Sequence, residues 1–166
     1  IEEAVEKTIQ YASETMEEAH SEREETEEII KSINERFLGQ NPITELEYGD
    51  VMSDEEIKEL TISKIKAELQ EKRELLGDDT MNSFEKYILL NAIDDRWTDH
   101  IDQMDQLRKG IFLRSYGQID PLREYKNEGH EMFEYMIDDI QVEVVSNLLR
   151  IRVERHEEIE IKEENT

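Results

Sequence analysis

The stretch "LRKGIFLRSYGQIDPLREY", residues 107 to 125, contains the turn that determines how this chain folds. Helical patterns of apolar residues reach it from both sides, and Ser115 to Pro121 interrupts them. Asp120 can cap the start of a helix, and Pro121 suits the first helical position because its φ is fixed near the helical value. The stretch therefore predicts two long helices joined by a short loop, an antiparallel helical hairpin.

Apolar residues recur at helical spacing on both sides of this turn. One helix is expected from about Asp79 to Leu113 and a second from Leu122 to about Arg155, and the first would be roughly 50 Å long at 1.5 Å per residue. Gly129 is expected to let the two helices approach closely. The apolar faces predict a buried seam formed by Trp97, Ile101, Met104, Tyr125, Met132 and Phe133.

Two shorter amphipathic stretches precede the hairpin. Residues 1–19 place apolar side chains at helical spacing, and a second stripe begins at Ile29 and ends near Gly39. Between them, residues 20–28 ("HSEREETEE") contain no apolar residue, so we expect the helix to break there. Residues 39–50, which hold Asn-Pro and two glycines, predict a connector.

A capping-box pattern opens the next helix. Ser53 and Glu56 can each satisfy a free backbone N–H of the other, and the helix should then run to Gly77. Together these patterns predict a small helical domain ahead of a long hairpin and an acidic tail. The predicted divisions are residues 1–78 for the small domain, 79–155 for the hairpin with its tip at about 114–121, and 156–166 for a disordered tail.

The composition narrows the class of protein. The 166 residues are 39% charged and 36% hydrophobic, which suits long helices that are exposed over much of their circumference. The formal net charge of −24 disfavours binding of the whole surface to nucleic acid or to an anionic membrane. No cysteine is present, which excludes disulfides and thiolate zinc sites, and no apolar run approaches the ~18 residues of a membrane span. We expect an elongated all-α protein with thin cores between helix pairs.

Two carboxylate patterns are candidates for a metal or acid–base site. Asp95, Asp99 and Asp102 share one helix face, but the apolar face lies about 200° away, so we interpret them as a solvated surface. Glu17 and His20 have the i, i+3 spacing of carboxylate-bridged metal pairs, but no second pair accompanies them. The sequence also contains no phosphate-binding glycine loop and no Gly-x-Ser-x-Gly motif. We therefore expect no catalytic residue, metal or cofactor in this chain.

The turn is basic within an acidic chain. From Arg108 to Lys126 there are five basic and two acidic residues, a net charge of +3. Helix capping explains part of this pattern, because cations near a helix C-terminus and Asp120 at the next N-terminus complement the helix dipoles. Capping does not explain Tyr116, which the loop would hold towards solvent. An exposed aromatic side chain on a rigid tip is commonly a contact residue, so we predict that role for Tyr116.

The segment from Ile88 to Met136 contains a Trp and a later His, then Met-Asp-x-Leu-Arg-x-Gly-Ile, Leu-Arg-x-Tyr, a Gln, a Pro and Glu-Tyr. In this pattern it resembles the C-terminal helical region of the SecA family, the bacterial ATPases that drive preproteins through the SecY channel. Residues 1–78 resemble the helical wing domain of the family more weakly. The matching positions are Trp97, His100, Met104, Asp105, Leu107, Arg108, Gly110, Ile111, Leu113, Arg114, Tyr116, Gln118, Pro121, Glu124 and Tyr125.

This resemblance implies that the hairpin is the two-helix finger of the helical scaffold, which enters the cytoplasmic mouth of the channel and restrains the ATPase of the motor. Tyr116 occupies the position of the tip tyrosine that contacts the translocating polypeptide. Gly117 stands where alanine is common in the family, and Phe112 where histidine is common. The residues implied to contact the polypeptide or the channel are Tyr116, Arg114, Gln118, Phe112 and Ile119, with Arg108, Lys109, Arg123 and Lys126 as the basic tip.

The resemblance also implies partners and a location. The motor domains that bind ATP and Mg²⁺ would lie outside this sequence, which starts at Ile1 within a helical pattern, so the chain itself is expected to be non-enzymatic. The expected partners are the SecY channel complex, the preprotein and the protein's own motor domains, at the cytoplasmic face of the bacterial membrane and without nucleic acid. Two other classes stay open on the residues alone: a free-standing acidic helical adaptor, and a metal-dependent enzyme that uses the aspartate face.

Overall fold

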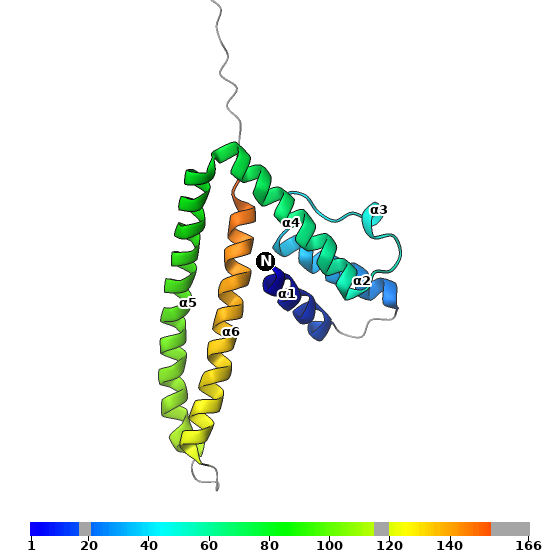
Figure 1. Ribbon diagram of the computed structural model, residues 1–166. Coiled ribbons are helices and arrows are strands. Elements are labelled where there is room, and N and C mark those ends of the chain that lie inside the picture. Colours follow the sequence, from blue (N-terminus) through cyan, green and yellow to red (C-terminus); the bar gives the residue numbers. More distant parts are fainter. Residues whose placement is uncertain (17–20, 115–119, 154–166) are drawn as a thin grey trace, which may run out of the picture.

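The computed structural model describes residues 1–16, 21–114 and 120–153, with the side chains of Phe112 and Arg114 excepted. All of its regular elements are helices, which confirms the all-α prediction. The longest two form an antiparallel hairpin, and the other four gather beside one end of it as a small bundle (Figure 1). The helices are α1 (Glu2–Thr15), α2 (Glu22–Arg36), α3 (Glu45–Tyr48), α4 (Asp54–Leu76), α5 (Asp78–Arg114) and α6 (Pro121–Arg150).

Helix α2 begins earlier than the sequence pattern predicts. Residues 22–28 are helical, so the expected break over residues 20–28 is wrong for this part; residues 17–20 lie outside the described chain. The Ser21 hydroxyl accepts a hydrogen bond from the Glu24 backbone N–H at 3.3 Å and caps the helix. The negative charges of the glutamates in the first turn interact favourably with the positive, N-terminal end of the helix dipole. A stretch without apolar residues can therefore still start a helix.

Capping residues set the other helix boundaries much as expected. Ser53 and Glu56 form the predicted capping box of α4. A second capping box, between Thr44 and Glu47, opens the short helix α3, which was not predicted, inside the expected connector. Asp120 caps α6, with its Oδ1 accepting from the Leu122 N–H at 3.0 Å.

A sharp corner joins the small bundle to the hairpin. Gly77 ends α4 with φ +80°, a left-handed conformation that favours glycine, and α5 begins at the next residue. Arg73 braces the corner from α4, because its guanidinium pairs with Asp78 at 3.3 Å and with Glu85 at 2.6 Å. The entry of α5 is therefore fixed by a short connection and by one multiply bonded arginine.

The core of the small bundle includes side chains from the hairpin. Val142, Val145 and Leu149 of α6 join buried residues of α1, α2 and α4 in one apolar cluster. The C-terminal half of α6 is thus packed on the bundle, and the N-terminal half extends away from it (Figure 1). The division of the chain at residue 78 remains a prediction. The cluster contains Ala4, Val5, Ile9, Ala12, Ile29, Ile30, Ile33, Phe37, Leu38, Ile43, Ile57, Ile65, Val142, Val145 and Leu149.

The seam between α5 and α6 is thin. Its buried apolar cluster consists of Ala92, Met136 and Ile140, with Val144 packed against it. Gly129 is buried on α6, and a Cβ atom placed there would lie 2.9 Å from Cε of Met104. The prediction that Gly129 permits a close approach therefore agrees with the packing.

Two glycine substitutions measure how tight this approach is. Gly110→Ala should raise the free energy of unfolding by about 0.5–1 kcal/mol, because Gly110 is helical and a new Cβ would meet nothing within 4 Å. Gly129→Ala should raise the free energy of unfolding by less than Gly110→Ala does, because the Met104 side chain must move to make room for the new Cβ. Urea unfolding of both variants gives the comparison. Equal gains would mean that Met104 does not limit the spacing of the helices.

The predicted seam residues Trp97, Ile101 and Phe133 do not lie in the seam. Their side chains are exposed, by 48%, 52% and 41%, so this part of the predicted core is wrong. The residue that α5 buries at this level is His100, which is 8% exposed and lies one helical turn before the half-buried Met104. Because histidine is not counted in an apolar pattern, the pattern placed the buried face of α5 on the neighbouring residues Trp97 and Ile101. Tyr125 and Met132 are half-buried.

The exposure of Trp97 changes the expected effect of removing it. Trp97→Ala in this chain should lower the free energy of unfolding by about 1–2 kcal/mol, below the ~3–5 kcal/mol typical of a fully buried aromatic residue. Trp97 is the only tryptophan, so its fluorescence reports this site alone. Acrylamide should quench the emission of the folded chain efficiently, and strong protection from the quencher would show that this flank is covered.

Candidate functional site

The last turn of α5 and the first turn of α6 lie at the end of the hairpin farthest from the small bundle (Figure 1). Helix α5 ends at Arg114 and α6 begins at Pro121, which agrees with a tip at about 114–121. Tyr116, Gln118 and Ile119 lie outside the described residues. Phe112 and Arg114 belong to the last turn of α5, where only their backbone is described. The bounds of the tip and the contact roles of these five residues remain predictions.

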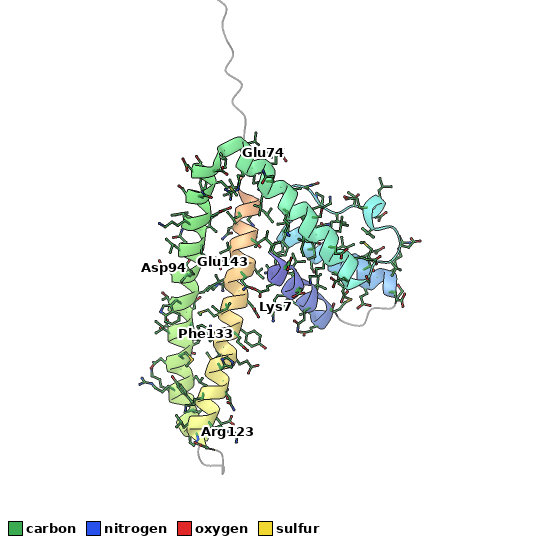
Figure 2. The ribbon with its side chains drawn as sticks, viewed as in Figure 1. Lys7, Glu74, Asp94, Arg123, Phe133 and Glu143 are labelled. Carbon is green, nitrogen blue, oxygen red and sulfur yellow. The ribbon has the colours of Figure 1, made fainter. Side chains whose placement is uncertain are left out.

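The described basic residues near the tip fall into two groups. Arg108 and Lys109 both pair with Asp105, at 2.6 Å and 2.5 Å, so part of their charge is neutralised within α5. Hydrogen bonds from Lys109 and Arg108 lower the pKa of the Asp105 carboxyl. Arg123 and Lys126 are exposed on the first turns of α6, and Figure 2 shows Arg123 at the tip end. The net charge of +3 counted over residues 108–126 therefore overstates how basic this end of the hairpin is, because it does not include Asp105.

One side of the hairpin carries an apolar flank, which we define as Ile93, Trp97 and Ile101 of α5 with Phe133 and Ile137 of α6. All five side chains are exposed. The members on each helix follow one another at i, i+4 spacing, so they share a face. His100 connects the two helices, because its ring centroid lies 5.8 Å from that of Trp97 and 5.9 Å from that of Phe133. Exposed apolar side chains grouped in this way make the apolar flank a candidate protein contact site.

Polar pairs hold the hairpin together and attach it to the bundle. Arg96 of α5 pairs with Glu143 of α6 at 2.7 Å, and its hydrogen bond to that carboxylate raises the arginine pKa. Lys7 of α1 pairs with Asp138 of α6 at 2.9 Å. The Arg96–Glu143 pair therefore joins the two hairpin helices, and the Lys7–Asp138 pair joins the hairpin to the bundle.

The C-terminal end of α6 is held by a buried lysine. Lys72 of α4 is 6% exposed, and its Nζ donates to the carbonyl oxygens of Leu148 and Leu149 at 3.3 Å and 2.5 Å. The same nitrogen pairs with Glu68 at 2.8 Å. Gln40 donates a further hydrogen bond to the Leu149 carbonyl at 3.2 Å. Residues of the bundle thus donate hydrogen bonds to carbonyls at the end of α6 that have no partner within the helix. In the sequence, the only indication of this contact was the i, i+4 pair of Glu68 and Lys72.

Neither carboxylate pattern forms a metal site in the part of the chain that the structure describes. Asp95, Asp99 and Asp102 are all exposed, and no group of three or more potential ligands comes together among the described residues. Glu17 and His20 lie outside the described residues. None of the described helices combines the length and the apolar character that a membrane crossing requires.

These features define a class of protein: an all-α chain whose long helical hairpin is attached at one end to a small helical bundle and extends away from it. The chain belongs to the SecA wing and scaffold domain family, whose model matches residues 1–152. This match confirms the resemblance drawn from Ile88 to Met136 and extends it through the small bundle. The wing and scaffold domain is a non-catalytic part of the SecA ATPase and acts in protein translocation.

Proposed function

We propose that this chain is the mechanical arm of a protein-translocation motor, and that the tip of its hairpin contacts the preprotein and the SecY channel. The observation that carries the proposal is the geometry of the hairpin in a member of this family. Helices α5 and α6 are held by the bundle at one end only, and the last turn of α5 and the first turn of α6 lie at the other end, away from the bundle (Figure 1). An arm of this shape can reach into an opening while its root stays attached to the rest of the motor.

The tip residues then have distinct roles. Tyr116 contacts the translocating polypeptide, helped by its neighbours Phe112 and Ile119, because an aromatic ring grips varied side chains at low entropic cost. Arg114 and Gln118 contact the channel or the polypeptide. Arg123 and Lys126 add positive charge at the tip, and Arg108 and Lys109 add less because Asp105 pairs with both.

The apolar flank is the surface through which the arm docks on the motor domains. Ile93, Trp97, Ile101, Phe133 and Ile137 are exposed in this chain, and covering them would bury apolar area alongside the seam. Docking here would let the motor move the arm and let the arm restrain the ATPase. ATP and Mg²⁺ would bind in the motor domains, and this chain would hold no cofactor. The protein would act in the cytoplasm, at the inner face of the bacterial membrane.

Site-specific crosslinking tests the tip contact. The chain has no native cysteine, so Tyr116→Cys introduces a single thiol into this part of the motor. In a stalled translocation complex, this thiol should crosslink to a cysteine in the preprotein. A cysteine at Lys86, exposed near the root of α5, is the matched control and should not crosslink. Equal crosslinking from both positions, or none from the tip, would contradict the proposed contact. Family membership favours this function over the free-standing adaptor.

A further inference from the structure

The hairpin has two halves that differ in how their helices are joined. His100 of α5 is buried in the seam, and its ring centroid lies 5.9 Å from that of Phe133 of α6, so these two residues mark one level of the hairpin. Figure 2 shows Phe133 part-way along α6, between the bundle and the far end. We call the side nearer the bundle the root half and the other side the far half. The root half comprises residues 78–99 and 134–150, and the far half comprises residues 100–114 and 121–133.

The root half contains the buried apolar cluster of the seam. This cluster is formed by Ala92, Met136 and Ile140. Arg96 crosses the seam and pairs with Glu143 at 2.7 Å. The C-terminal part of α6 also belongs to the core of the small bundle. Apolar burial, an ion pair and the bundle therefore all hold the root half closed.

The far half is joined by fewer contacts. Ile111 is the one apolar side chain there that the structure describes as buried. Over residues 100–111 and 129–133, each ion pair that the structure describes lies within one helix. Apolar side chains of the seam such as Met104 and Met132 are half-buried. Separating the two helices in this half therefore costs less buried apolar area and breaks fewer polar contacts than separating them in the root half.

His100 weakens the seam at the boundary between the halves. The residue is 8% exposed, and its Nδ1 is buried without a hydrogen-bond partner among the described residues. Such an atom has lost its hydrogen bond to water and has gained none in the protein, which destabilises the closed state. A pocket of about 120 Å³ lies beside His100 and is lined by residues of both helices, including Gln103 and Met132. The two helices are therefore incompletely packed at this level.

We propose that the far half of the hairpin unfolds locally, as a unit, while the root half stays folded, and that His100 sets the ease of this opening. In the open state water reaches Nδ1 of His100, which offsets part of the contact energy that the far half loses. The root half keeps Arg96 paired with Glu143 and keeps α6 packed on the bundle. This inference concerns motion within the hairpin and does not rest on the proposed tip contact.

Hydrogen exchange of backbone amides in the whole chain, followed by mass spectrometry, tests the proposal. Amides of the far half should be protected at least about tenfold less than amides of the root half. His100→Leu removes the unpartnered polar atom and should slow exchange of the far half by about tenfold. His130→Leu makes the same replacement at an exposed position of the far half and should change exchange by less than about twofold. His100→Phe, which keeps a ring beside Phe133, should also slow exchange and decides the point if the leucine variant does not fold.

A variant in the root half separates local opening from unfolding of the whole hairpin. Val145 is 6% exposed in the core that α6 shares with the bundle, so Val145→Ala should speed exchange of root-half amides by at least about tenfold. Far-half amides should stay within about twofold of the wild type, because their exchange does not require the root half to unfold. The proposal is overturned if the two halves are equally protected in the wild type, if Val145→Ala speeds both halves equally, or if His100→Leu and His100→Phe slow exchange no more than His130→Leu does.

Discussion

Transport of preproteins by the intact motor should fall by roughly tenfold or more when Tyr116 is replaced by alanine. The proposed function places this ring at the end of the arm, where it supplies an apolar surface and one hydroxyl on two rotatable bonds. Alanine removes the whole gripping surface, and the neighbouring loop backbone cannot replace it. The measurement is the rate at which a labelled preprotein becomes protected from protease inside membrane vesicles.

Conservative variants control for the chemistry of the ring. Tyr116→Phe and Tyr116→Trp should retain most of the transport, because an aromatic surface remains. Thermal unfolding of Tyr116→Ala should match the wild type within about 0.5 kcal/mol, as expected for a solvated loop residue. Wild-type transport by Tyr116→Ala would move the contact to Phe112 or Ile119, on either side of the loop, and would remove it from this residue.

Replacing Lys72 with methionine should lower the free energy of unfolding by about 3–5 kcal/mol. Methionine fits the buried volume but carries no charge and no donor. Glu68 would keep a buried carboxylate without its cation, and the carbonyls of Leu148 and Leu149 would lose the Nζ donor. Urea unfolding followed by circular dichroism measures the loss.

Matched variants separate the buried pair from a general effect of losing a lysine. Lys66→Met lies on the same helix at an exposed position and should change stability by less than about 0.5 kcal/mol. The double variant Lys72→Met with Glu68→Gln should recover part of the loss, because no unpaired charge stays buried. A cost for Lys72→Met no larger than that for Lys66→Met would show that the ion pair contributes nothing to the attachment of α6.

Local signals in the sequence were sufficient to predict most helix boundaries. Ser53, Gly77 and Asp120 act within one turn of their own position, so their capping roles do not depend on the rest of the fold. Ser21 acts in the same way, but the uninterrupted run of polar residues after it concealed the start of α2. The hairpin and its turn were predictable because the apolar pattern stops and restarts around Pro121.

Features that depend on distant segments were not predictable. His100 occupies the seam because α6 meets that side of α5, and an apolar pattern on one helix does not reveal where its partner will lie. Lys72 binds the end of α6, 76 and 77 positions further along the chain, and a Glu-Lys pair four residues apart is ordinary on a solvent face.

The hydrogen bonds of Lys72 at the C-terminal end of α6 also help to fix the orientation of the hairpin relative to the bundle. Helix α6 has 30 residues, roughly 45 Å at 1.5 Å per residue, so each degree of rotation at the root displaces the tip by about 0.8 Å. Loss of the Lys72 hydrogen bonds to the two carbonyl oxygens at the root would therefore displace the other end of α6 much more than the root itself. By this leverage, a buried residue of α4 helps to determine the position of the far end of α6.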